Sequence, residues 1–235
     1  MEQHGLTFEI ITNTASLIAI MHIFRKDIER LAVNSIKYLK TRKRKYKSDF
    51  MFVVYIVIGT IPAAVLGLLF SDVIALYLTS LILLLSLCLL QESHYGSFVI
   101  LKEINERENL TGKDALIVGL AQAVALVPGI SRSGSTIITS IALGMKQNTA
   151  LRFAFMLYIP VSIGGMVLGA SDIISDPALQ ALAIPYAAAF AASLCMTYFA
   201  MRWFIGIMKS GKLQYFSYYC FIVGILLLIF APVLN

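Results

Sequence analysis

The sequence has 235 residues, of which 59% are hydrophobic and only 14% are charged, and its mean hydropathy is +0.82. Soluble domains contain about 45 to 50% apolar residues, so this composition excludes an ordinary soluble domain and indicates an integral membrane protein. The net charge of +6 does not indicate a nucleic-acid partner, because the densest basic run, Lys37 to Lys47, lies beside apolar segments. Basic residues there mark the cytoplasmic side and attract anionic lipids. The three cysteines lack the spacing of a disulfide framework or a zinc site.

Six apolar stretches reach or approach the roughly 20 residues that a membrane-spanning helix needs. They are Thr7 to Phe24, Phe50 to Phe70, Val73 to Leu90, Thr149 to Ala170, Leu179 to Ala200 and Phe216 to Leu234. Between the third and the fourth, Lys113 to Pro128 and Ile137 to Met145 are each too short to cross, and a polar segment separates them. This pattern predicts a re-entrant helix hairpin.

We therefore expect an all-α polytopic membrane protein with one membrane domain over residues 1–235. Its parts would be a three-helix group over 7–90, the re-entrant hairpin over 113–145 and a second three-helix group over 149–234. The strings Thr60 to Ala64 and Ala183 to Ala187 both contain Ile-Pro and occupy equivalent places in the two groups. They suggest an inverted repeat, a design in which the site tends to lie near the membrane midplane.

Basic residues give the expected orientation. If the hairpin enters and leaves by one face, every Lys and Arg except Arg132 falls on one side of the membrane. Because basic connections remain in the cytoplasm, this distribution predicts the basic segment 25–49 in the cytoplasm and both termini outside. Within that segment a helix is expected to lie in the membrane interface, because its apolar residues recur at helical spacing. These residues are Ile28, Leu31, Ala32, Ile36 and Leu39.

The polar segment from Pro128 to Thr136 carries the most informative chemistry. An arginine within the membrane costs roughly 2.5 to 3.5 kcal/mol on insertion scales, so Arg132 should face a partner or a watery cavity. Its planar fork suits phosphate oxygens, and hydroxyls beside it can add hydrogen bonds. We expect Ser135 or Thr136 to cap a half-helix beginning at Ile137. The segment is not a Walker loop, since it lacks the lysine. The alternative is that the serines join helices and Arg132 extends to an interface.

These residues resemble the BacA-type undecaprenyl-diphosphatases, membrane enzymes that remove the terminal phosphate from undecaprenyl diphosphate and so recycle the carrier lipid of the bacterial cell wall. Pro128 to Thr136 fits the PGxSRSxxT signature of that family at every fixed position. The flanking segments Gly119 to Ala123 and Phe153 to Pro160 are similar to the family's, as is the helix containing Gly59 to Gly67.

The resemblance implies that Ser131, Arg132 and Thr136 hold the diphosphate as the catalytic set. It also implies substrate-binding roles for neighbouring residues, which are Gly129, Ser133, Gly134, Ser135 and Gln122. The expected partners are a polyprenyl diphosphate and membrane lipids, in the inner membrane of a bacterium, with access to the site from the outer face. A divalent cation, most simply Mg²⁺, is the implied cofactor. The oligomeric state stays open, with a homo-oligomer as one option.

Members of the family usually begin with another re-entrant hairpin, rich in glutamates, serines and a histidine, and no such stretch occurs in this sequence. Glu9 is the one acidic residue within an expected span and is a weak candidate for a metal ligand; a carboxylate favoured by the helix dipole explains it equally well. Two alternatives to the enzyme therefore stay open. One is a non-enzymatic binder or translocator of polyprenyl phosphates, and the other is an inactive truncated homologue whose true start lies upstream.

Overall fold

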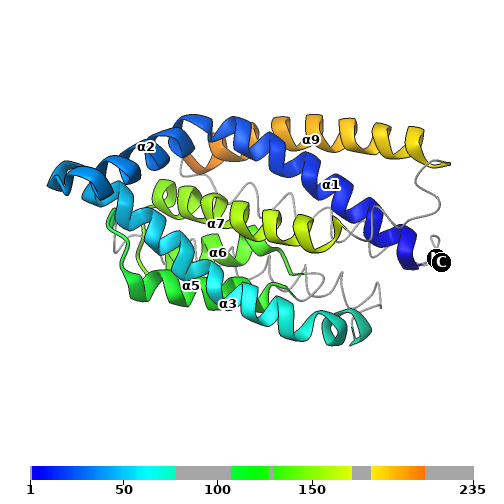
Figure 1. Ribbon diagram of the computed structural model, residues 1–235, viewed down its shortest axis with the longest axis horizontal. Helices are drawn as coiled ribbons and strands as arrows, with labels where there is room; N and C mark the ends of the chain where they lie inside the picture. Colours follow the sequence, from blue (N-terminus) through cyan, green and yellow to red (C-terminus); the bar gives the residue numbers. More distant parts are fainter. Residues whose placement is uncertain (1, 78–106, 127–129, 171–180, 210–235) are drawn as a thin grey trace. The chain divides into compact units, whose positions relative to one another are not determined.

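The computed structural model describes residues 2–77, 107–126, 130–170 and 181–209, and every regular element in these ranges is a helix (Figure 1). The elements are α1 (Glu2–Ile23), α2 (Arg25–Thr41), the short 3-10 helix η1 (Arg44–Tyr46), α3 (Lys47–Tyr77), α5 (Gly112–Val124), α6 (Arg132–Ala142), α7 (Gln147–Leu168) and α9 (Ala183–Lys209). The expected sixth span, 216–234, and all of the expected third span beyond residue 77 lie outside the described residues. The expectation of an all-α protein is confirmed for the described residues.

Within the described ranges, three helical stretches are long and apolar enough to cross a membrane: Arg44–Leu69, Gln147–Leu168 and Ala183–Met208. A fourth is present if the bent pair α1 and α2 counts as one span. The first, second, fourth and fifth expected spans therefore all coincide with helices. Together with the composition, these helices make the chain a membrane protein.

The expected break between the second and third spans is wrong. Ser71 and Asp72 were expected to form a connection outside the membrane, but α3 continues through both of them to Tyr77. Serine and aspartate lower helix propensity by only a fraction of a kcal/mol each, and neither glycine nor proline accompanies them there. Two polar residues between long apolar runs are therefore insufficient to end a helix.

The chain packs as two compact units, Met1–Val53 with Tyr158–Phe204 and Val54–Leu157 with Ile205–Asn235. In the first unit, polar side chains join α1 to α9: Ser16 Oγ lies 3.1 Å from Ser193 Oγ and 2.9 Å from Thr197 Oγ1. Tyr158 on α7 donates a hydrogen bond to Asn13 Oδ1 on α1. Hydroxyl and amide groups commonly join helices in this way where water is scarce.

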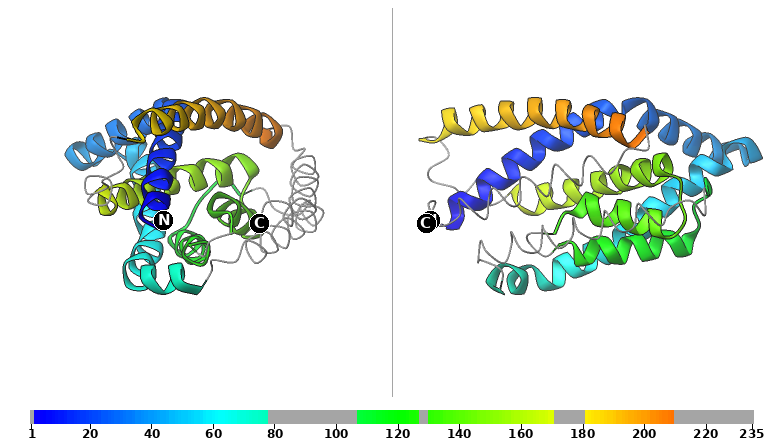
Figure 2. Two further views of the ribbon diagram at one scale, coloured as in Figure 1. Left: turned by 90° about the vertical axis from the view of Figure 1, so that its right-hand side faces the viewer. Right: turned by 180° about the vertical axis from the view of Figure 1, so that it is seen from behind.

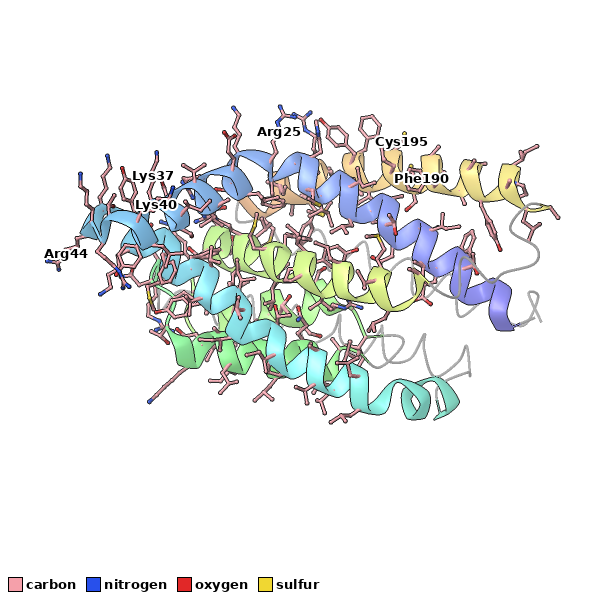
Figure 3. The ribbon with its side chains drawn as sticks, viewed as in Figure 1. Arg25, Lys37, Lys40, Arg44, Phe190 and Cys195 are labelled. Atoms are coloured by element: carbon pink, nitrogen blue, oxygen red, sulfur yellow. The ribbon has the colours of Figure 1, made fainter. Side chains whose placement is uncertain are left out.

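A sharp bend separates α1 from α2 in the same unit. The axis turns by 72° between the two helices. The bend can be followed where the dark blue ribbon of α1 meets the lighter blue ribbon of α2 (Figures 1 and 2). Beyond the bend, Leu31 is buried whereas Ile36 and Leu39 are more than half exposed. The expected amphipathic helix therefore exists, and it presents apolar side chains among its basic ones (Figure 3).

In the second unit, glycines bring α3 and α5 into close contact. A Cβ atom built on Gly119 would lie 2.5 Å from the carbonyl oxygen of Gly59, closer than any real contact allows. The start of α7 packs in the same unit, since Phe153 and Leu157 are completely buried. These contacts hold α5, the first helix of the expected hairpin, against its neighbours.

Candidate functional site

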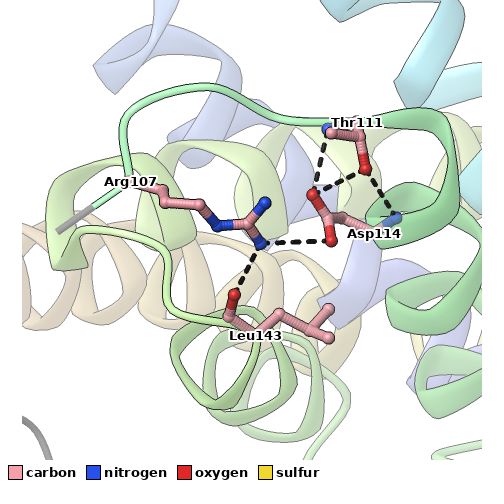
Figure 4. Close-up of polar contacts among 4 residues, drawn as sticks. All are labelled: Arg107, Thr111, Asp114 and Leu143. Atoms are coloured by element: carbon pink, nitrogen blue, oxygen red, sulfur yellow. Dashed lines mark hydrogen bonds and ion pairs between the residues drawn. The ribbon is translucent and has the colours of Figure 1, made fainter. Parts of the chain in front are cut away.

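The two hairpin helices are tied together at their base. Arg107, which precedes α5, donates hydrogen bonds from Nη2 to Asp114 Oδ1, 3.3 Å away, and to the carbonyl oxygen of Leu143 at the end of α6 (Figure 4). One guanidinium therefore joins the first turn of α5 to the end of α6. Because these opposite ends meet at one residue, the two helices run antiparallel, and they lie side by side in both views of Figure 2.

Backbone contacts close the same base. Arg107 N donates to Gly144 O at 2.9 Å, and Lys146 N donates to Arg107 O at 3.0 Å, which forms an isolated parallel bridge between the entering and leaving segments. Lys146 Nζ also lies 3.0 Å from Glu108 Oε1, but the Glu108 side chain is largely exposed and that of Lys146 is partly exposed. Exposed ion pairs contribute little, so the backbone bonds and Arg107 fix the base.

Helix α5 begins with a capping box. Thr111 Oγ1 accepts a hydrogen bond from Asp114 N, and Asp114 Oδ2 accepts one from Thr111 N at 3.0 Å. Asp114 is buried, and its carboxylate accepts further hydrogen bonds from Thr111 Oγ1 and Arg107. Neither Asp114 nor the role of Arg107 was predicted from the sequence. The Thr-Gly-Lys-Asp spacing of a capping box was the signal that could have identified the helix start.

The signature residues from Ser131 to Thr136 form the cap and the first turn of α6. The helix begins at Arg132, and its N-cap is Ser131, whose Oγ accepts a hydrogen bond from Gly134 N at 3.1 Å. The expectation of a half-helix that begins at Ile137 with Ser135 or Thr136 as its cap is therefore wrong. Serine and threonine are both good N-caps, and the chain uses the first hydroxyl that follows the tip of the hairpin. Consequently the signature adopts helical structure five residues earlier than expected.

The structure places the signature side chains as follows. Arg132 is half-buried, with its Nε shielded from solvent, and Ser133 and Ser135 are half-buried as well. Ser131 is exposed, whereas Gly134 and Thr136 are buried. Thr136 Oγ1 lies 3.1 Å from Arg132 O and 3.0 Å from Ser133 O, so its hydroxyl donates to the backbone of its own helix. Its role at a diphosphate stays a prediction.

Gln122 lies on α5, near the end of that helix. Its side chain is 1% exposed, and its Nε2 has no hydrogen-bond partner among the residues that the structure describes. A buried amide donor without a partner costs about 1 to 3 kcal/mol, so such a group invites a polar ligand. Gly129, the remaining substrate-binding candidate, lies outside the described residues.

The charges of the α6 turn favour an anion. No acidic residue lies in the first turn of α6, and the first residue of the helix is the cation Arg132. A helix N-terminus carries a positive potential, so a cation there is unfavourable unless an anion offsets it. Backbone N–H groups at such a terminus also form a natural phosphate site. The arrangement can therefore hold a phosphate between the guanidinium and the helix terminus.

The described residues do not bring together a cluster of metal-ligating side chains. They contain no group of three or more His, Cys, Asp or Glu side chains that could hold a metal ion. Glu9 lies on α1 in the first unit, where its side chain is exposed and its carbonyl accepts a hydrogen bond from Thr12 Oγ1. An isolated exposed carboxylate is a poor magnesium site, so the structure gives no support for Glu9 as a ligand.

Comparison with known proteins identifies the family. A family described as bacitracin resistance protein BacA matches residues 1–226. A protein of Bacillus cereus named undecaprenyl-diphosphatase 1 is 51% identical over 229 residues, which cover 96% of this chain and 84% of the relative. The undecaprenyl-diphosphatase of Oceanobacillus iheyensis is 48% identical over 98% of this chain and 84% of its own length. With the family matched almost from end to end, this chain belongs to the BacA family.

Proposed function

We propose that this chain is an undecaprenyl-diphosphatase, which uses water to convert undecaprenyl diphosphate into undecaprenyl phosphate and inorganic phosphate. Relatives about half identical over nearly the whole chain carry that name. The observation that carries the proposal is the half-buried Arg132 at the first position of α6, in a turn without any acidic residue. The positive potential of such a turn attracts an anion, and a diphosphate supplies one with several charged oxygens.

Each part of the turn has a chemical task in this proposal. The guanidinium of Arg132 donates two parallel hydrogen bonds to phosphate oxygens, a geometry that lysine does not reproduce. The N-terminal amides of α6 add fixed positive potential at the same point. Negative charge shifts among the phosphate oxygens as the anhydride bond breaks, and preorganised donors of this kind lower the barrier.

The depth of the hairpin suits a lipid head group. Helix α5 has 13 residues, which at about 1.5 Å per residue make roughly 20 Å, whereas the hydrocarbon core of a bilayer is about 30 Å thick. We place the base with Arg107 and Lys146 on the basic, cytoplasmic side. The tip with Ser131 then ends inside the membrane, nearer the outer face, where an isoprenoid diphosphate of the outer leaflet can reach it.

The finer topology belongs to the same proposal. We place the chain in a bacterial inner membrane with six spans, both termini outside, and the hairpin re-entrant between the third and fourth spans. A divalent cation, most simply Mg²⁺, would be the cofactor of this reaction.

Phosphate release from undecaprenyl diphosphate, measured with and without magnesium, tests the proposed function. We expect Arg132→Ala to lower kcat/KM by about 100-fold or more, as removal of a preorganised donor does in other enzymes, and Arg132→Lys to restore only part of the activity. Arg44→Ala is the matched control, because Arg44 is exposed on η1, outside the hairpin. Equal rates for wild type and Arg132→Ala would exclude Arg132 from the reaction. Binding of the lipid without any turnover would replace the enzyme with the binder or translocator.

A further inference from the structure

A second polar pocket lies at the bend between α1 and α2, within the first unit. It has a volume of about 350 Å³. Its polar lining consists of His22, Arg25, Lys26, Asp27, Tyr198 and Arg202. The first four belong to the bend and the last two to α9, so side chains far apart in the sequence meet in one cavity. None of these residues belongs to the hairpin.

Two guanidinium groups are held at this pocket by neighbouring rings. Arg25 Nη1 lies 2.8 Å from His22 Nε2, and Arg202 Nη1 donates to Tyr198 Oη at 3.1 Å. The Arg202 guanidinium also stacks over the Tyr198 ring, 5.6 Å from its centroid. Each of these contacts uses one of the five donors of an arginine, so both side chains are oriented and retain donors for a ligand.

The charge of the lining is unbalanced. Arg25, Lys26 and Arg202 have no carboxylate within ion-pair distance among the described residues. Asp27 is the one acidic group of the pocket, and its Oδ1 also lies 3.0 Å from Arg30 Nη2. Three cations and one carboxylate leave the lining with a net positive charge, which favours a small, strongly charged anion such as a phosphate.

The surroundings of the pocket indicate where the anion comes from. Helix α2 leaves the pocket with Val33, Ile36 and Leu39 exposed by 40%, 54% and 58%. Lys37, Lys40 and Arg44 extend from the same segment, as Figure 3 shows together with Arg25. A helix with exposed apolar side chains and a basic polar face is typical of a membrane surface, where phosphate groups of lipids are abundant.

We propose that this pocket binds the phosphate of an anionic phospholipid head group. Arg25 and Arg202 grip the phosphate oxygens, Lys26 adds charge, and the apolar residues of α2 lie along the acyl chains. The site is separate from the proposed diphosphate site, because it shares no residue with the hairpin. The group that the pocket recognises is a phosphate. Inorganic phosphate from the cytoplasm could supply the same group, so the experiment must distinguish it from the lipid.

The test compares two double variants of the full chain in a neutral detergent. Arg25→Gln with Arg202→Gln removes two pocket charges, and Lys43→Gln with Lys45→Gln removes two exposed charges outside the pocket. Binding of phosphatidylglycerol is titrated by native mass spectrometry, and inorganic phosphate is titrated as a competitor at constant ionic strength. We expect at least about a tenfold weaker affinity for phosphatidylglycerol in the pocket variant, since each charged hydrogen bond is worth that much. The control should change less than threefold.

Phosphate release from undecaprenyl diphosphate confirms that both variants are folded, because neither touches the hairpin; Arg202→Gln alone serves if the pocket double variant does not fold. If inorganic phosphate displaces phosphatidylglycerol only at concentrations far above the Kd of the lipid, the result supports the lipid as the ligand. Competition at similar concentrations would overturn the lipid and leave a site for free phosphate. Equal weakening in the pocket variant and the control would overturn the site altogether, because diffuse charge would then explain the binding.

Discussion

At the scale of single residues, Ser131 and Arg132 occupy the cap and the first position of α6. Ser131 fixes where the helix begins. Because Arg132 is the first residue of the helix, its guanidinium lies beside the helix terminus. An arginine is a poor choice there for stability, since its charge has the same sign as the helix dipole at that end. We infer that this cost is retained because the turn binds an anion.

Two substitutions at Ser131 separate its structural role from its chemical role. Ser131→Ala removes the cap and should weaken α6 by about 1 kcal/mol. Ser131→Asp keeps a cap, because a carboxylate oxygen accepts the bond from Gly134 N, but it places a negative charge where the diphosphate binds. We expect hydrogen exchange of the α6 amides to be faster in Ser131→Ala and close to wild type in Ser131→Asp.

Phosphate release gives the second readout for these variants. We expect Ser131→Asp to be the less active of the two, although its helix is the more stable. If Ser131→Asp hydrolysed the lipid as fast as wild type, Ser131 would lie away from the bound diphosphate and would serve only as a cap.

At the scale of helices, the hairpin depends on its base and on one close contact. Arg107 bonds to Asp114 and Leu143 at the base, and Gly119 packs against Gly59 on α3. Neither contact involves the signature. The base and the glycine contact together fix the direction of α5 within its unit.

Removal of Arg107 should loosen the base. Arg107→Ala leaves the buried carboxylate of Asp114 with only its bonds to Thr111. A charged hydrogen bond is worth about 1.5 to 3 kcal/mol, and because the Arg107 side chain is 43% exposed we expect a loss of about 1 to 2 kcal/mol. Thermal unfolding in detergent measures this loss. Arg30→Ala is the matched control, because the exposed pair of Arg30 with Asp27 should contribute less than about 1 kcal/mol. Equal unfolding temperatures for the two variants would contradict a clamp at the base.

The contact between α3 and α5 should not tolerate one added methyl group. In Gly119→Ala the new Cβ would overlap Gly59 O and Cα, so the helices must separate, at a cost of about 1 to 3 kcal/mol. Gly164→Ala on α7 is the control, because among the described residues no atom outside the neighbouring part of α7 lies within 4 Å of its added Cβ, and it should be neutral or slightly stabilising. The same thermal assay compares them. A Gly119→Ala protein as stable as Gly164→Ala would contradict the close contact.

The positions of the long helices could be predicted from the sequence, but the length of α3 and several helix ends could not. The apolar runs located α1, α3, α7 and α9, because a membrane helix needs a long uninterrupted stretch. The start of α6 was misplaced because Ser131, Ser135 and Thr136 are all acceptable caps, and tertiary packing decides among them. Arg107 was counted only as a basic residue, since its partner Leu143 is distant in sequence and reaches it only after the hairpin has formed.

At the scale of the whole molecule, the distribution of basic residues sets the orientation that the mechanism needs. The base of the hairpin must face the cytoplasm if the tip is to meet a lipid diphosphate of the outer leaflet. The basic segment 25–49 is expected on that same side, because basic connections remain in the cytoplasm.

Cysteine labelling in intact cells tests this orientation. In a chain whose native cysteines are replaced by serine, Lys45→Cys should react with a membrane-impermeant maleimide only after the cells are permeabilised. Ser171 lies between the fourth and fifth expected spans, a connection that falls outside if both termini are outside and the spans alternate, so Ser171→Cys should react without permeabilisation. The reverse pattern would place the hairpin base outside and would contradict access to the site from the outer face.

The central claim is that the guanidinium of Arg132 holds the diphosphate of the lipid. Binding of a non-hydrolysable farnesyl diphosphonate to wild type and to Arg132→Gln tests it most directly, because equilibrium affinity does not depend on turnover. We expect at least about a tenfold loss of affinity in Arg132→Gln, the value of one charged hydrogen bond, and no more than a small change in Arg44→Gln. Equal affinities for wild type and Arg132→Gln would contradict the claim.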